Sequence, residues 1–386
     1  MKKILIACRS YFPDVMGGGE LSTKSLAENL KAQGFDVHVF AISDTFKDEQ
    51  INNVTIHRVK QFNVYWSYKG KSENKIKKIM WHILDSNNFF GVKSIEKILE
   101  DIKPDILITS TIEDVSSIIW KIAHKKNIKV IHILRSYSLL CTNANMYKKE
   151  NCTHQCNSCS IISKPKKINS QYVDIVVGIS DYILKKHKNL GYFQKAKEKV
   201  IYNICSDIQL IQKEEKKAED DRLKIGYLGR IHETKGIDLI FDSLRHFSDE
   251  DKGKISLRIA GNGDDKYLSF LSKIAQKNNI ETLFVGSVNQ YDFLNRIDLL
   301  IVPSKWQEPF GRVIVESIMS SVPVLVSNKG GMPELLEENP DFIFNDAHEL
   351  SDKISKFIKN ELVFNFQINR FLTEKIMNDW HDLINQ

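Results

Sequence analysis

Short apolar runs alternate with segments of helical spacing along most of the 386 residues. Ile4–Cys8 and Val37–Ile42 have the length of buried strands. Between them, Leu21–Gln33 places leucines near one helical face and stops before Gly34. The strand pattern recurs at Asp105–Thr109, Lys129–Leu134 and Asp174–Gly178. Strands that alternate with helices predict an α/β fold, with a parallel sheet covered on both faces.

The same pattern restarts in the second half of the chain. Residues 206–222 are mostly charged and predict a linker or an exposed helix. New strand candidates follow at Leu223–Leu228, Ser256–Ala260, Thr282–Val285, Leu299–Val302 and Val324–Val326. We therefore expect two doubly wound domains, 1–205 and 223–365, whose parallel sheets face a central cleft. A C-terminal helix at about 366–386 is expected to pack back on the first domain.

Two stretches lack this regular alternation. Residues 61–90 mix aromatic side chains with lysines, and residues 141–170 hold four cysteines with little periodicity. Long irregular insertions in compact domains are often functional.

Composition indicates an ordinary globular protein, with 42% apolar and 27% charged residues. The apolar run at the start, Ile4–Cys8, is interrupted by Arg9 and is shorter than the roughly 7–15 residues of a secretion signal. No run approaches the roughly 18 residues of a membrane span. The sequence therefore predicts a cytoplasmic protein, in which disulfides are disfavoured.

The net charge of +6 is unevenly distributed. Residues 1–205 carry 32 Lys and Arg against 19 Asp and Glu, or +13, and residues 206–386 carry 23 against 30, or −7. A basic first half suits anionic lipid or an anionic acceptor, although a generally lysine-rich proteome gives the same imbalance. It contains no recognisable nucleic-acid recognition module, so no nucleic-acid partner is expected.

A glycine-rich turn, Gly17-Gly18-Gly19-Glu20, follows the first predicted strand and opens a helix. Glycines allow close backbone approach to a ligand, and a helix N-terminus favours phosphate. The alternative is a tight strand-to-helix turn with no ligand.

The second domain repeats this arrangement with fixed cations. Gly226-Tyr227-Leu228-Gly229-Arg230 leads into Ile231-His232-Glu233-Thr234-Lys235-Gly236 at a strand-to-helix junction. Arg230 and Lys235 could hold a diphosphate and stabilise it as it leaves. The alternative is a pair of solvent-exposed surface cations.

Two glutamates follow the predicted strand Leu299–Val302. If a helix begins near Gly311, Glu308 lies in the loop before it and Glu316 lies in its second turn. Both carboxylates could then face one pocket. The alternative is a capped helix with a solvated Glu316.

Together these runs resemble the retaining glycosyltransferases of family 4, which have the GT-B fold of two Rossmann-like domains. The resemblance rests on Y-L-G-R-I-H-E-T-K-G, P-S-K-W-Q-E-P-F-G-R-V-I-V-E-S and S-N-K-G-G-M-P-E-L. It includes G-I-S at Gly178–Ser180, I-Y-N at Ile201–Asn203 and A-G-N-G at Ala260–Gly263, and it covers most of the chain.

The resemblance implies a role for each matching residue. Arg230 and Lys235 would bind the diphosphate of a UDP- or GDP-sugar, Glu316 would hold the ribose, and Glu308 would position the transferred sugar. Further donor contacts are implied at Gly18, Gly19, Gly229, Gly263, Val288, Phe310, Gly311 and Arg312. The first domain would bind the acceptor and the second the donor. Retention of anomeric configuration and no cofactor required for catalysis are also implied.

One departure from the family concerns the acceptor side. Many relatives carry a His-Asp pair after a first-domain strand, where this chain has Arg135 and Ser136. Arg135 stays protonated and cannot act as a base, but it could bind an anionic acceptor or the donor phosphate. His132 falls within the predicted strand, where it is either a structural residue or an acceptor-side residue.

The cysteines Cys141, Cys152, Cys156 and Cys159 are spaced compactly enough to hold one structural Zn²⁺. Free thiols and redox pairing are the alternatives. Cys8 and Cys205 are expected to be buried.

The lysine–aromatic stretch at 61–90 is either a contact with an anionic membrane surface or a solvated lid. A membrane contact would make the protein peripheral on the inner face of the membrane.

The sequence thus predicts a retaining glycosyltransferase for bacterial surface polysaccharide, with a glycan or lipid-linked acceptor. A nucleotide-sugar epimerase and a non-catalytic nucleotide-sugar-binding protein are the alternatives.

Overall fold

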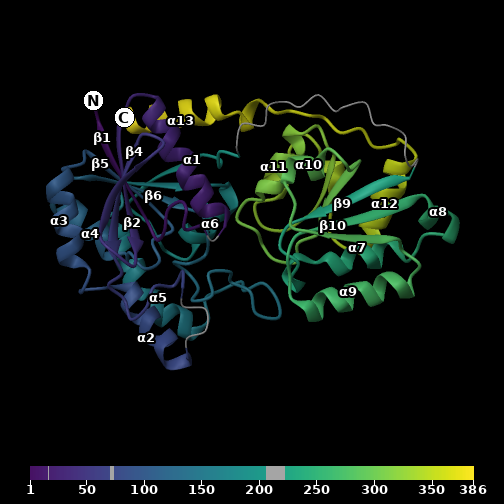
Figure 1. The fold of residues 1–386 in the computed structure, drawn as a ribbon, viewed down its shortest axis with the longest axis horizontal. Coiled ribbons are helices and arrows are strands. Elements are labelled where there is room, and N and C mark those ends of the chain that lie inside the picture. Colours follow the sequence, from purple (N-terminus) through teal and green to yellow (C-terminus); the bar gives the residue numbers. More distant parts are fainter. Residues whose placement is uncertain (16, 70–73, 206–221) are drawn as a thin grey trace. The chain divides into compact units, whose positions relative to one another are not determined.

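The computed structural model describes residues 1–15, 17–69, 74–205 and 222–386, and these residues divide into two compact units (Figure 1). Unit 1 comprises Met1–Ser206 with Thr373–Gln386, and unit 2 spans Asp207–Leu372. The predicted linker at 206–222 lies outside the described residues except for Arg222.

Unit 1 contains an eight-stranded sheet of order β3-β4-β2-β1-β5-β6-β7-β8. All neighbours pair in parallel except β3 and β4, which form an antiparallel hairpin. The strands are β1 (Lys3–Cys8), β2 (Asp36–Ser43), β3 (Lys47–Ile51), β4 (Val54–Lys60), β5 (Ile106–Ser110), β6 (Lys129–Leu134), β7 (Ile175–Gly178) and β8 (Lys197–Val200).

The central strands β1, β5 and β6 are buried almost throughout, as helices on both faces of a parallel sheet require. The covering helices of unit 1 are α1 (Gly18–Ala32), α2 (Lys75–Ser86), α3 (Val92–Ile102), α4 (Ile118–Lys125), α5 (Asn157–Asn169), α6 (Asp181–Asn189) and α13 (Thr373–Asn385), with a short turn η1 (Ser170–Tyr172).

The last helix of the chain belongs to unit 1. Helix α13 begins at Thr373, and the residues before it, as far as Leu372, group with unit 2. It buries Met377 and Trp380, and the Gln33 amide at the end of α1 donates a 3.3 Å hydrogen bond to the Met377 carbonyl.

Unit 2 contains a six-stranded, wholly parallel sheet of order β11-β10-β9-β12-β13-β14. Its strands are β9 (Leu223–Leu228), β10 (Ile255–Ala260), β11 (Thr282–Gly286), β12 (Leu299–Val302), β13 (Val324–Ser327) and β14 (Ile343–Phe344). Its helices are α7 (Ile237–Leu244), α8 (Asp249–Gly253), α9 (Asp265–Lys277), α10 (Gln290–Leu294), α11 (Arg312–Met319) and α12 (Ala347–Ile358), with short turns η2 (Glu233–Lys235), η3 (Pro333–Leu336), η4 (Pro340–Phe342) and η5 (Asn369–Phe371).

Every predicted strand is present, and the α/β fold with two mostly parallel sheets is confirmed. The insertions, however, are more ordered than their sequences indicate. Residues 61–90 contain α2, and residues 141–170 contain α5, whose pattern is obscured by Pro165 inside the helix. No helix among the described residues is long and apolar enough to cross a membrane.

Candidate active site

The chemistry-bearing residues of unit 2 lie in the loops that follow its strands. Arg230 and Lys235 come after β9, and Glu308 comes between β12 and α11. Because parallel strands end at the same edge of a sheet, these loops are neighbours. The Lys235 ammonium donates a 2.7 Å hydrogen bond to Glu308 Oε1. The sequence did not predict this ion pair, although it singled out both members.

The Lys235–Glu308 pair is only partly shielded from solvent. The Lys235 side chain is 19% exposed and that of Glu308 is 13% exposed, and the ammonium lies 5.4 Å from the centroid of the Trp306 ring. A partly exposed ammonium can exchange a carboxylate for another anion, since water and ligands still reach it. Arg230 is exposed, and its carbonyl accepts a 2.8 Å hydrogen bond from the buried Tyr227 hydroxyl.

The Glu308 backbone is fixed by a glycine pair far along the chain. The Gly331 amide donates a 2.8 Å hydrogen bond to the Glu308 carbonyl. Gly330 has a φ of +64°, and a Cβ there would lie 2.2 Å from the Glu308 carbonyl oxygen. Only glycine tolerates both conditions. The run S-N-K-G-G therefore positions Glu308. The sequence analysis quoted this run but assigned it no role.

Glu316 lies in the second turn of α11, as the predicted helix start near Gly311 required. Its side chain is buried, with 6% exposed, and pairs with Arg312 at 3.4 Å. The alternative of a solvated Glu316 is therefore wrong. Burial raises the pKa of this carboxyl, while Arg312 opposes the shift. A buried carboxylate with a single cationic partner retains capacity to accept hydrogen bonds from hydroxyl groups.

Glycines bring the ends of β9 and β10 into direct backbone contact. Gly261 has a φ of +135°, and a Cβ there would lie 1.8 Å from the Gly229 carbonyl oxygen. A Cβ on Gly263 would lie 2.3 Å from the Ile231 carbonyl oxygen. The strand ends therefore present bare backbone beside Arg230. Of the other predicted donor residues, Val288 is exposed after β11, Phe310 is buried, and Gly311 caps α11 at a φ of +118°.

In unit 1 the glycine turn meets residues from other strands. A Cβ on Gly19 would lie 3.2 Å from Thr111, and 4.0 Å from Arg135 Cδ. Arg135 Nε donates a 2.8 Å hydrogen bond to the Ser110 hydroxyl, and its Nη1 donates to the Asn203 amide oxygen. The structure thus places a fixed guanidinium near the N-terminus of α1, where the Gly17 amide donates a 3.1 Å hydrogen bond to Glu20 Oε2.

His132 does not join this group. It is buried inside β6, its Nδ1 lies 2.8 Å from the Thr109 hydroxyl, and its ring stacks on Phe193. Burial lowers the pKa of its imidazole to about 3, so the ring stays neutral. The acceptor-side interpretation of His132 is therefore wrong, because the ring does not reach the surface.

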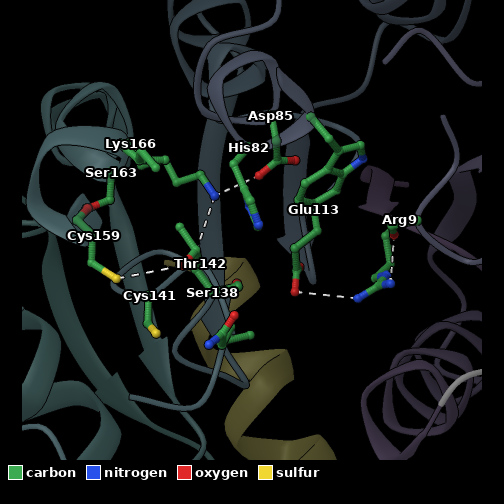
Figure 2. Close-up of a pocket in the computed structure, with 15 residues that line it drawn as sticks. Arg9, His82, Asp85, Glu113, Ser138, Cys141, Thr142, Cys159, Ser163 and Lys166 are labelled. Carbon is green, nitrogen blue, oxygen red and sulfur yellow. Dashed lines mark hydrogen bonds and ion pairs between the residues drawn. The ribbon is translucent and has the colours of Figure 1, made fainter. Parts of the chain in front are cut away.

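A cavity of about 140 Å³ opens in unit 1 where the loops after β1, β5 and β6 meet α2 and α5 (Figure 2). Its lining includes Arg9, His82, Asp85, Glu113 and Lys166. One water needs about 10–15 Å³ of such space, so the cavity has room for a ligand the size of a sugar ring. Arg9 follows β1 and Glu113 follows shortly after β5. Charged residues at these strand ends could have pointed to this cavity, but the sequence analysis did not use them.

Glu113 contributes a carboxylate to the wall of this cavity. Its Oε1 lies 3.6 Å from the Arg9 guanidinium, as Figure 2 shows. Its Oε2 is buried and accepts no hydrogen bond from the described residues. A buried polar atom without a partner costs about 1–3 kcal/mol, so this carboxylate is held in an unfavourable environment.

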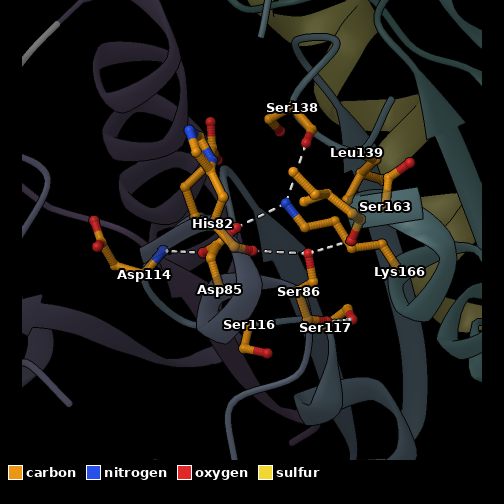
Figure 3. Close-up of polar contacts among 12 residues, drawn as sticks. His82, Asp85, Ser86, Asp114, Ser116, Ser117, Ser138, Leu139, Ser163 and Lys166 are labelled. Atoms are coloured by element: carbon orange, nitrogen blue, oxygen red, sulfur yellow. Dashed lines mark hydrogen bonds and ion pairs between the residues drawn. The ribbon is translucent and has the colours of Figure 1, made fainter. Parts of the chain in front are cut away.

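A buried ion pair supports the opposite wall (Figure 3). Lys166 of α5 donates 2.7 Å and 3.2 Å hydrogen bonds to Asp85 Oδ2 and the Ser138 carbonyl. Asp85 Oδ1 accepts a 2.7 Å bond from the Asp114 amide. Removing one partner of such a pair is strongly destabilising, since it leaves a bare buried charge. The pair therefore fixes α2, α5 and the loop after β5 as one frame.

The loop after β5 holds strained backbone. Thr111, Asp114 and Ser116 have φ values of 47°, 68° and 75° although none is glycine. Such strain costs of order 1–3 kcal/mol per residue and clusters at functional sites. Asp114 accepts hydrogen bonds from Trp81 Nε1 at 2.8 Å and from Ser67. Burial nevertheless raises its pKa to about 7.

The four cysteines predicted to bind zinc line a neighbouring cavity of about 50 Å³. They are free thiols: Cys141, Cys152, Cys156 and Cys159. Across the part of the chain that the structure describes, no three His, Cys, Asp or Glu side chains are arranged to hold a metal ion. As they lie, the four thiols do not fit a structural zinc ion, and the zinc site stays a prediction from their spacing. Cys8 and Cys205 are buried, as expected.

Models of two families match the chain. The model described as glycosyl transferases group 1 matches residues 208–370, and the model described as glycosyl transferase 4-like matches residues 14–140. These segments include Lys235, Glu308 and Glu316 in unit 2, and Glu113 and Arg135 in unit 1.

Two bacterial relatives are similar to this chain. An uncharacterized 42.6 kDa protein in the cps region of Klebsiella pneumoniae is 35% identical over 354 residues, which are 91% of this chain and 92% of that protein. The O-antigen biosynthesis glycosyltransferase WclY of Escherichia coli is 26% identical over 218 residues, 53% of this chain and 60% of WclY.

Among solved structures, Anabaena Alr3699/HepE in complex with UDP and glucose is similar to this chain with a TM-score of 0.70. The likeness covers 100% of both chains at 17% identity. It shows that the two proteins share a fold.

Replacing Asp114 by asparagine is expected to flatten the pH dependence of stability. The folded protein keeps the Asp114 proton up to about pH 7, while the unfolded chain releases it near pH 3.8. This carboxyl therefore makes the wild type less stable as the pH rises through that window, and an uncharged amide removes the contribution. Urea unfolding of both proteins at about pH 5 and about pH 7.5 measures it. A wild-type-minus-variant difference in unfolding free energy that is equal at both pH values would refute the raised pKa.

Proposed function

This chain belongs to the group 1 glycosyltransferases, and we propose that it moves a sugar from a nucleotide-sugar donor to a hydroxyl group of a glycan or lipid-linked acceptor. Its two mostly parallel sheets are those of the GT-B fold. Relatives from capsule and O-antigen regions favour bacterial surface polysaccharide as the product. The observation that carries the proposal is the Lys235–Glu308 pair beside exposed Arg230, with buried Glu316 in the helix that follows Glu308.

We assign donor binding to unit 2. Lys235 would exchange its Glu308 contact for a phosphate oxygen, and Arg230 would bind a second phosphate oxygen, since both cations are accessible. Glu316 would accept hydrogen bonds from the ribose hydroxyls. The Anabaena protein was solved with UDP and glucose, which supports a uridine nucleotide as the first donor to test.

The proposed reaction keeps the anomeric configuration. The acceptor hydroxyl attacks the anomeric carbon on the face from which the nucleoside diphosphate leaves, and a phosphate oxygen of the donor takes the proton. Positive charge develops on the sugar ring, and negative charge develops on the departing diphosphate. Arg230 and Lys235 stabilise that negative charge because they are held in place before the bond breaks. Glu308, released from Lys235, positions the sugar through its hydroxyl groups.

We assign acceptor binding to the unit 1 cavity. Glu113 Oε2 would accept a hydrogen bond from an acceptor hydroxyl, and Arg9 would keep the carboxylate oriented. Arg135, beside the glycine turn, would hold an anionic group of the acceptor or a donor phosphate.

Lys235→Ala is expected to lower turnover at saturating donor by about 10²–10³, because one preorganised charge on the leaving group is lost. The measurement is the rate of sugar transfer, with EDTA present in a parallel series. Lys266→Ala, which removes an exposed lysine from α9, is the matched control and should transfer at the wild-type rate. Wild-type turnover in Lys235→Ala, or sugar conversion without any acceptor, would contradict the proposal. Loss of activity in EDTA would contradict the expectation that catalysis requires no metal ion.

Glu113→Gln is expected to raise the KM for acceptor about tenfold and leave the KM for donor unchanged. The substitution weakens one charge-assisted hydrogen bond, worth about 1.5–3 kcal/mol, without changing the size of the side chain. Steady-state kinetics with each substrate varied in turn provides the test. Glu96→Gln, on the exposed face of α3, is the control. A change confined to the donor KM would place the acceptor elsewhere.

A further inference from the structure

Helix α2 presents an apolar stripe to solvent. Ile76, Ile79, Met80 and Ile83 are 71%, 55%, 48% and 58% exposed. Their spacing of three, four and seven residues places them within about 100° of one another around the helix. A continuous exposed stripe of this kind marks an interaction surface, unlike apolar residues scattered singly.

The opposite face of α2 attaches the helix to unit 1. Trp81 and Asp85 are buried and lie about 170° around the helix from the centre of the stripe. Trp81 bonds Asp114, and Asp85 pairs with Lys166. Figure 3 shows the Asp85–Lys166 pair. Because these contacts fix the rotation of the helix, the exposed stripe is held on its outer side.

Lys75 and Lys77 flank the stripe at about 90–110° from its centre, and Lys78 lies on the far side of the helix. Lys75, Lys77 and Lys78 are exposed on α2, and the first turn of the helix contains no acidic residue. Helix α5, which packs against α2, adds exposed Ile161 and Ile168 with exposed Lys164 and Lys167. Each of the two helices thus combines exposed isoleucines with cations, which suits an apolar surface bearing negative charge.

The tryptophans of 61–90 do not form this surface, although the sequence analysis grouped them with the lysines. Trp66 and Trp81 are buried. The exposed apolar residues include the four on α2 and two phenylalanines shortly after it, Phe89 and Phe90.

We propose that α2 lies in the surface of an anionic membrane, parallel to its plane. The stripe would insert between lipid headgroups and acyl chains, and the lysines would bind anionic headgroups. With 12 residues the helix is about 18 Å long, too short to span a bilayer core of about 30 Å. A second copy of the chain fits less well, because pairing of the two stripes would bring these lysines together.

The same helix forms part of the wall of the unit 1 cavity through Trp81, His82 and Asp85. A membrane-bound α2 would therefore hold the cavity next to the lipid headgroups. If the proposed transfer function is correct, the acceptor class is a sugar carried on a membrane lipid. The membrane contact itself needs no transfer activity.

Flotation of the full chain with vesicles tests the surface. The wild type should bind vesicles of phosphatidylcholine with about 30% phosphatidylglycerol at least tenfold better than pure phosphatidylcholine, and salt should weaken binding. Ile79→Asp/Ile83→Asp and Lys75→Gln/Lys77→Gln/Lys78→Gln should each reduce binding about tenfold or more. Phe46→Asp/Val363→Asp, which changes two exposed apolar residues outside α2 and α5, is the matched control and should bind like the wild type.

Circular dichroism and light scattering on the same proteins separate the alternatives. Folded, monomeric variants that lose vesicle binding support the proposal. Wild-type protein that does not float, variants that float unchanged, or a wild-type oligomer that Ile79→Asp/Ile83→Asp dissociates would overturn it. Stabilisation of the chain by a nucleotide sugar, measured in parallel, reports on the transfer function. If no nucleotide sugar stabilises the chain while vesicle binding is intact, the transfer function is refuted and the membrane surface is not.

Discussion

Parallel pairing of strands is the constraint on which both units depend. Each strand must be followed by a crossover before the chain can add the next one, so the loops after the strands gather at one edge of each sheet. In unit 2 this edge brings Lys235, after β9, to Glu308, after β12. In unit 1 it brings Gly19, Ser110 and Arg135 together from the ends of three strands. Residues far apart in the sequence therefore meet as a consequence of the strand topology alone.

Buried charge adds a second level of organisation in unit 1. Asp85 and Lys166 are 81 residues apart, and their pair ties α2 to α5 and to the strained loop after β5. Such a pair adds little net stability compared with apolar residues, but it requires one geometry. That geometry directs Glu113 into the cavity and turns the isoleucines of α2 toward solvent. The candidate acceptor pocket and the candidate membrane surface therefore depend on the same frame.

Much of the fold could be predicted from the sequence, because its central strands are apolar on both faces and bounded by clear stop signals. Four strands were missed. The exposed polar residues of β3 and β8, which read K-D-E-Q-I and K-E-K-V, hide them, β4 mixes polar with apolar residues, and β14 has only two residues. The candidate donor residues could be singled out because glycines and charges cluster in short motifs. The Asp85–Lys166 pair could not, since only the tertiary fold joins its members. Glu113 and Asp114 follow shortly after β5 and could have been singled out as charged residues at the end of a strand. The spacing of apolar residues alone does not identify them as site residues.

Donor binding tests the central claim most directly. The measurement is a thermal-shift panel of UDP- and GDP-sugars, in EDTA, on wild type, Glu316→Ala and the exposed-residue control Glu361→Ala. The account predicts a shift of a few degrees with one donor in the wild type and the control, and none in Glu316→Ala. No shift with any donor, or an equal shift in Glu316→Ala, would contradict the assignment of the donor site to unit 2.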